Sequence, residues 1–103
     1  MCIEDVQTLY DKELVILTQH FIDRIGIRGI SLIDVKTAIF NGYIIEQYPD
    51  DYPHPSALIL GFSEDKPLHV LIGKNGGYVW LITSYKPEST KWENDYKTRK
   101  AVK

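Results

Sequence analysis

The sequence predicts an α+β fold in which two N-terminal helices pack on a four-stranded antiparallel meander sheet. Before Gly42, apolar residues recur at helical spacing, and after it they form short runs rich in β-branched and aromatic residues. The connections between the later runs are short and rich in turn-forming residues. The chain has 103 residues, of which 44% are hydrophobic, so it is long enough for a single domain with one modest core.

The first helix is expected over residues 9–25. Its apolar stripe follows three- and four-residue spacing and consists of Leu14, Leu17, Phe21 and Ile25, widened by Val15 and Ile22. His20 and Arg24 fall on the border of this stripe, so we expect them to be partly sheltered. The second helix is expected to begin after Ser31, an N-cap residue followed three positions later by Asp34 in a weaker relative of the capping box, and to end at 41–42.

Four strands are expected after the second helix, over residues 43–48, 57–62, 68–73 and 78–85. Segments 63–67 and 74–77 fit hairpin connections, whereas segment 49–55 contains three prolines and is expected to form a stiff surface loop. Alternation along the last strand places Val79, Leu81, Thr83 and Tyr85 on one face and Trp80, Ile82 and Ser84 on the other.

The domain core is expected over about residues 9–86, followed by a polar tail over 87–103. This tail is expected either to form a short helix fixed by Trp92 or to become ordered only on a partner. The net charge of −2 is unevenly distributed, because residues 1–85 carry six basic and eleven acidic side chains and residues 86–103 carry six and three. Such a basic tail can reach toward RNA, lie on its own domain or contact an acidic partner.

The single cysteine, Cys2, cannot form an internal disulfide, which fits a reducing compartment. The N-terminus lacks the pattern of a secretory signal, and no apolar stretch approaches the length of a membrane span. We therefore expect a soluble, cytoplasmic protein without a membrane partner. The sequence leaves its oligomeric state open.

His20, Arg24 and Arg28 recur every fourth residue, so their side chains project from one side of the expected helix. Arginine is suited to bidentate contact with phosphate, and the group therefore predicts an anion site. Gly26 weakens the helix before Arg28, which can place the third member on the helix end. The alternative is structural: a backbone hydrogen bond for His20 and ion pairs with neighbouring carboxylates for Arg24.

His69 lies inside the third expected strand, and a histidine there is either a satisfied core imidazole or a group that moves protons. If the third and fourth strands form a hairpin, His69 can approach Thr83 and Tyr85. Tyr85 can then contact a base or a phosphate, or be an aromatic residue at the rim of the sheet. No histidine or cysteine spacing indicates a metal, and residues 73–77 are explained by a hairpin turn, so we expect no metal and no cofactor.

The chain resembles the domain-of-unknown-function family DUF4258 in four motifs in the same order. They are Leu17-Thr18-x-His20-x3-Arg24-x3-Arg28-Gly29-Ile30-Ser31, Ala38-Ile39-x-Asn41-Gly42-x-Ile44-Ile45-Glu46-x-Tyr48, Pro67-Leu68-His69-Val70 and Leu81-Ile82-Thr83-Ser84-Tyr85-Lys86-Pro87. The resemblance covers roughly residues 14–92. Ser84 is a departure, because relatives often have an apolar residue before the tyrosine.

The resemblance implies a fold similar to the barnase, EndoU and RelE group of metal-independent ribonucleases, which are often encoded as toxins beside an antitoxin. RNA and an antitoxin protein are therefore the expected partners. The polar pattern of the family falls on His20, Arg24, Arg28, His69, Thr83 and Tyr85. Of these, Thr83 is grouped with the neighbouring Lys86 as substrate-binding and the others as catalytic.

Two functional hypotheses follow. In the first, the chain is an endoribonuclease in which the RNA 2′-hydroxyl attacks the adjacent phosphate. Either His69 or His20 takes the proton of the 2′-hydroxyl, and the other protonates the leaving oxygen. Arg24 and Arg28 hold the developing charge, and Tyr85 positions the phosphate or a base. In the second, the same residues form a non-catalytic module that binds phosphate or protein, or only a structural ion-pair network. The basic tail is a candidate interaction segment in either case.

Overall fold

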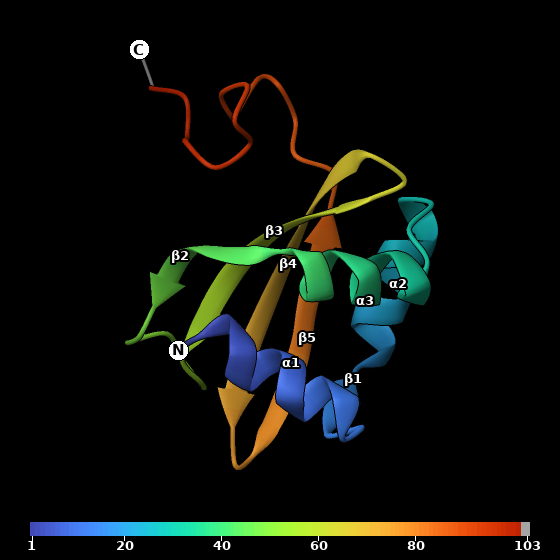
Figure 1. Ribbon diagram of the computed structural model, residues 1–103, viewed down its shortest axis with the longest axis vertical. Coiled ribbons are helices and arrows are strands. Elements are labelled where there is room, and N and C mark those ends of the chain that lie inside the picture. Colours follow the sequence, from blue (N-terminus) through green and yellow to red (C-terminus); the bar gives the residue numbers. More distant parts are fainter. Residues whose placement is uncertain (102–103) are drawn as a thin grey trace.

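The computed structural model describes residues 1–101, which form three helices and one five-stranded sheet (Figure 1). The helices are α1 (Ile3–Asp11), α2 (Gln19–Ile27) and α3 (Leu32–Asn41). The strands are β1 (Val15–Leu17), β2 (Tyr43–Tyr48), β3 (Ser56–Ser63), β4 (Lys66–Asn75) and β5 (Tyr78–Tyr85), in the order β1-β5-β4-β3-β2. Residues 102–103 of the predicted tail lie outside the described part.

The predicted antiparallel meander is present as β2 to β5, each strand pairing with the next in sequence. The β4–β5 turn consists of Gly76 and Gly77, with φ angles of 62° and 79°. Two positive φ angles in a two-residue loop match the right-handed twist of the flanking strands, which is why glycine occurs there. The proline-rich segment between β2 and β3 is outside regular structure, as expected.

The prediction of one continuous helix over residues 9–25 is wrong. This segment contains the end of α1, the strand β1 and most of α2. The chain leaves α1 through Glu13, whose φ is 60°, a left-handed conformation that ends a helix. Helix α2 then starts anew at Thr18, whose hydroxyl accepts a hydrogen bond from the Phe21 N–H at 3.1 Å.

Strand β1 adds a fifth, parallel strand to the predicted four-stranded sheet. It lies beside β5, with Val15 opposite Val79 and Leu17 opposite Leu81. Its residues are consecutive and apolar, which fits a short buried strand as well as one side of a helix. The choice between the two is made by β5, which offers an unpaired edge to this segment.

Helix α3 confirms the second predicted helix and has a complete capping box. The Asp34 N–H donates to the Ser31 hydroxyl at 3.0 Å, and the Ser31 N–H donates to the Asp34 carboxylate at 2.8 Å. The helix lies very close to β3 at Gly61, where a Cβ atom would overlap the backbone of Ala38. Glycine at this position therefore sets the distance between the helix and the sheet.

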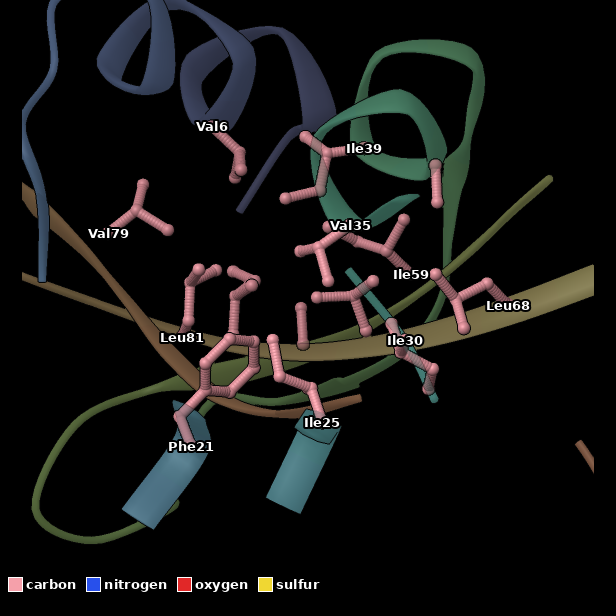
Figure 2. Packing of buried hydrophobic residues seen from close by; sticks show 14 residues of the cluster. Val6, Phe21, Ile25, Ile30, Val35, Ile39, Ile59, Leu68, Val79 and Leu81 are labelled. Carbon is pink, nitrogen blue, oxygen red and sulfur yellow. The ribbon is translucent and has the colours of Figure 1, made fainter. Parts of the chain in front are cut away.

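The hydrophobic core lies between the three helices and one face of the sheet (Figure 2). Each helix contributes buried side chains, for example Val6 from α1, Phe21 from α2 and Val35 from α3. The sheet contributes Ile59 and Leu81, among others. Since all three helices pack on this face, the opposite face of the sheet is open to the C-terminal tail.

A bulge in β5 changes the face on which Thr83 lies. Leu81 pairs with Ile72, but Thr83 pairs with Leu71, so Ile82 is an extra residue in the ladder. The predicted grouping of Thr83 and Tyr85 with Leu81 is therefore wrong. Val79 and Leu81 point into the core, whereas Thr83 and Tyr85 pair with residues of the opposite face.

The C-terminal tail, residues 86–101, folds onto this opposite face without forming a helix. The short helix, one of the two alternatives expected for the tail, is therefore absent, although Trp92 does fix the tail, because its side chain is only 3% exposed. Trp92 and Arg99 form an isolated antiparallel bridge that closes a compact loop. Within residues 1–101, Cys2 is free and exposed, and no helix is long and apolar enough to cross a membrane.

Candidate functional site

The site begins with a cross-strand pair on the face of the sheet that the helices leave open. His69 on β4 lies directly opposite Tyr85 on β5. Its Nδ1 atom is 3.2 Å from the Tyr85 hydroxyl, and the two rings meet edge to face with centroids 5.2 Å apart. The expected approach of these two residues is thus present, and it follows from the hairpin register.

The protonation of His69 is set by the tail. Its Nε2 atom is 2.6 Å from the backbone carbonyl oxygen of Tyr96. A carbonyl can only accept a hydrogen bond, so Nε2 carries the proton and Nδ1 accepts from the Tyr85 hydroxyl. Burial lowers the pKa of His69 and raises the pKa of Tyr85. At neutral pH the pair therefore consists of a neutral imidazole and a protonated phenol.

The tail covers His69 completely, leaving it 0% exposed. The Trp92 ring meets the imidazole edge to face at a centroid distance of 4.5 Å, and the Arg99 guanidinium lies 4.6 Å from the Trp92 ring. Arg99 also donates two hydrogen bonds of 2.9 Å to the Glu46 carboxylate on β2. These bonds lower the pKa of Glu46, so the ion pair that ties the tail to the sheet persists at neutral pH.

Arg28 approaches the same region from the C-terminal end of α2. Its Nη1 atom donates to the Thr83 hydroxyl and to the Ser84 carbonyl oxygen, both at 2.9 Å. β1 pairs with β5 only as far as Leu81, so the β5 backbone beyond that point pairs with β4 on one edge and with no strand on the other. Arg28 takes the place of the missing strand and is held there by these two bonds.

These elements enclose a pocket of about 320 Å³, here called the cationic pocket. Four of its lining side chains are basic, namely Arg28, Lys86, Lys91 and Arg99. The others are the acidic Glu88 and the aromatic Tyr85 and Trp92. The excess of basic groups contrasts with the net charge of −2 for the chain. Local charge, an arginine fixed by hydrogen bonds and a tyrosine hydroxyl make this pocket suitable for a phosphate group.

A larger hollow of about 660 Å³ adjoins the cationic pocket and shares Tyr85 and Arg99 with it. Leu58 and Leu71 also line this central hollow, as do Asp50 and Asp51 from the proline-rich loop. Within residues 1–101, no group of three or more histidine, cysteine or carboxylate side chains could hold a metal ion.

His20 and Arg24 lie outside the cationic pocket, although both were expected to join Arg28. His20 precedes Arg28 by eight residues and Arg24 precedes it by four. Eight residues of α-helix rise about 12 Å along the helix axis, so His20 is well separated from Arg28. Both side chains are exposed, so the expected shelter is absent. The reason is that α2 buries Phe21 and Ile25, and each polar residue is rotated about 100° from the buried neighbour that follows it.

Sequence reasoning missed the contribution of Trp92, Tyr96 and Arg99 to the site. The only available signal was a tryptophan, Trp92, within a basic and polar tail. It predicted that the tail is fixed by this side chain, but not which part of the domain the tail contacts. The acidic partner Glu46 was part of a family motif without an assigned role. The tail therefore supplies a ring that buries His69, a carbonyl that selects its tautomer, and a cation of the pocket.

The family model described as "Domain of unknown function (DUF4258)" matches residues 17–86, which is more than half of the chain. The matched range includes Arg28, His69, Tyr85 and Lys86, and it ends before the tail segment that closes over them. No curated protein and no solved structure matches the chain.

Proposed function

We propose that this chain, which belongs to the DUF4258 family, is a metal-independent endoribonuclease of the barnase, EndoU and RelE type. The observation that carries the proposal is the contact between the Tyr85 hydroxyl and His69 Nδ1 at the wall of the cationic pocket. Cleavage of RNA by its own 2′-hydroxyl needs a proton acceptor next to a bound phosphate, together with positive charge for the transition state.

Arg28 and the lysines of the pocket are the proposed phosphate ligands. Within residues 1–101, Arg28 donates hydrogen bonds only through Nη1, to Thr83 and Ser84, so Nε and Nη2 can donate to a phosphate. An arginine fixed in this way loses little conformational freedom when the ligand binds. Thr83 is then a positioning residue for Arg28 rather than a direct ligand, and Lys86 keeps its proposed role in binding substrate.

In the proposed reaction the RNA 2′-hydroxyl gives its proton to the Tyr85 oxygen while Tyr85 passes its own proton to His69 Nδ1. The 2′-oxygen bonds to the adjacent phosphorus, and the bond to the 5′-oxygen breaks. The leaving oxygen takes a proton from Lys86 or Lys91. The products carry a 2′,3′-cyclic phosphate and a 5′-hydroxyl, and the Tyr96 carbonyl stabilises the imidazolium formed at His69.

These roles differ from those that the sequence alone favoured. His20 was expected to exchange protons with the same phosphate as His69, but the two do not line a common pocket. Arg24 is exposed on α2 and does not line the cationic pocket either. The proposed proton donor is therefore a lysine, and the proposed charge stabiliser is Arg28.

A second candidate function is a non-catalytic phosphate-binding module. The observation that favours it is the complete burial of His69, because both ring nitrogens already have partners and the ring has no direct access to a ligand. In this case the His69–Tyr85 pair would only support the wall of the pocket.

The two candidates are separated by measuring RNA cleavage and RNA binding on the same variants. Tyr85→Phe removes only the hydroxyl, and proton transfer commonly contributes about 10²- to 10⁴-fold to a rate. We expect Tyr85→Phe and His69→Gln to lose cleavage on this scale while RNA binding changes little. Arg28→Ala should lose both, and Tyr43→Phe, on the β2 edge strand, should lose neither. Binding that depends on Arg28, without any cleavage by the wild-type protein, would support the binding module instead.

We further propose an acidic antitoxin as the protein partner, bound by the outward-facing basic residues of the tail. Lys97 and Lys100 are exposed, whereas Arg99 is occupied by Glu46. The overall charge of −2 gives the chain little general attraction for RNA.

A further inference from the structure

A third hollow lies on the open face of the sheet, beside the central hollow and away from the cationic pocket. Its volume is about 340 Å³. Its walls are largely aromatic and apolar, and they include His20, Tyr52, Pro53, His54, Leu71 and Trp80. We call it the aromatic hollow. It contains His20, whose place in the family motif is not explained by the proposed mechanism.

The aromatic hollow presents flat rings rather than charged groups. The rings of His54 and Trp80 lie 5.2 Å apart at an angle of 35°, and Tyr52 is 92% exposed at the rim. The wall that carries Tyr52 and His54 belongs to the segment with three prolines, which restrict its backbone. A large exposed tyrosine beside a half-buried tryptophan favours a planar aromatic ligand that inserts or stacks.

The three hollows are connected across the sheet. The aromatic hollow shares Leu71 with the central hollow, which in turn shares Tyr85 and Arg99 with the cationic pocket. Trp80 and Tyr85 are five residues apart on β5, which corresponds to about 15 Å. The open face therefore has cations at one end and aromatic rings at the other, separated by about the length of a few nucleotides.

We infer that the aromatic hollow binds an unstacked nucleobase of the same single-stranded RNA whose phosphate occupies the cationic pocket. This inference rests on the proposed function. Single-stranded RNA is the ligand class that carries both a phosphate and a planar ring in each repeat, so one strand can satisfy both ends of the face. Trp80, His54 and Tyr52 stack on the base, and His20 at the rim donates to the base or to its sugar-phosphate.

Binding is measured by fluorescence anisotropy with a labelled 2′-O-methyl oligonucleotide, which cannot be cleaved by its own 2′-oxygen. Stacking of one base on an aromatic side chain corresponds to about 5- to 150-fold in affinity. We expect Trp80→Ala and Tyr52→Ala each to weaken binding within this range. Tyr43→Ala is the matched control, because it removes an exposed tyrosine from the β2 edge strand. Tyr52→Ala also avoids a folding defect, since the side chain is almost fully exposed.

A second oligonucleotide series replaces one base at a time by an abasic sugar. If the base occupies the aromatic hollow, Trp80→Ala will lose no further affinity for the oligonucleotide that lacks that base. Full affinity in both Trp80→Ala and Tyr52→Ala, while Arg28→Ala is weakened, would overturn the inference and leave the proposed function in place. Absence of RNA binding by the wild-type protein would instead overturn the proposed function, and the inference with it.

Discussion

Trp92→Ala is the substitution that most directly tests whether the tail is part of the site. The indole is 3% exposed and lies between the His69 imidazole, at a centroid distance of 4.5 Å, and the Arg99 guanidinium, at 4.6 Å from the ring. Its removal takes away the ring that covers His69 and the surface on which Arg99 rests. The substitution leaves the Tyr85 hydroxyl and Arg28 unchanged.

The expected loss of stability follows from the burial of this side chain. A tryptophan buries about 200 Å², and at about 25 cal/mol per Å² this corresponds to about 5 kcal/mol. Measured values for large aromatic residues replaced by alanine are about 3–5 kcal/mol. We therefore expect the free energy of unfolding to fall by about 3–5 kcal/mol. A fall below about 1 kcal/mol would show that the tail detaches independently of the sheet.

The same substitution should change how stability depends on pH. Burial lowers the pKa of His69 below its ordinary value of 6.5 in the folded state. As the pH falls below 6.5, the unfolded chain therefore takes up a proton before the folded chain, and the wild-type protein loses stability on acidification. Trp92→Ala admits water to the imidazole and raises its pKa toward the ordinary value, so this acid-dependent loss becomes smaller.

Urea unfolding at about pH 8 and about pH 5.5 measures this difference. His69→Gln is the reference, because it removes the titrating group. His54→Gln is the control, because it removes a histidine of the proline-rich loop, which packs on Trp80. NMR titration of the His69 ring gives the pKa directly. If acidification costs the wild-type protein and Trp92→Ala the same stability, burial by Trp92 does not lower the pKa of His69 and the argument fails.

Two further predictions concern the fold and the partner. Gly61→Ala places a Cβ against the backbone of Ala38 and should lower the free energy of unfolding, measured by urea unfolding, by about 1–3 kcal/mol or more. A smaller loss would mean that α3 moves away from β3 without an energetic cost. Lys97→Glu combined with Lys100→Glu should reduce co-purification of an acidic antitoxin while leaving the melting temperature unchanged. Undiminished co-purification would exclude the tail as its binding surface.

Local sequence signals predicted the elements that depend on near neighbours. The Ser31–Asp34 capping box, the glycine turn between β4 and β5 and the four meander strands were all recognised, because each involves residues close together in the chain. The segment 14–17 was assigned to a helix instead of a strand, since its apolar run fits either structure. Its partner is β5, more than sixty residues away, and no local pattern reports that pairing.

Residue types and spacing alone indicated Arg28, His69, Thr83 and Tyr85, which lie together, and also His20 and Arg24, which do not join them. Lys86, which lines the same pocket, was indicated only by the resemblance to DUF4258. The DUF4258 motifs were likewise present in the printed sequence. Tertiary structure decided how these side chains combine. The β4–β5 register sets His69 against Tyr85, the bulge turns Thr83 to the open face, and the buried face of α2 directs His20 and Arg24 into solvent. The tail adds Trp92 and Arg99 to the site because moving the Trp92 indole from water onto the sheet is favourable in free energy. The apolar surface that receives the indole exists only after the strands have paired, so the sequence alone does not show where the tail binds.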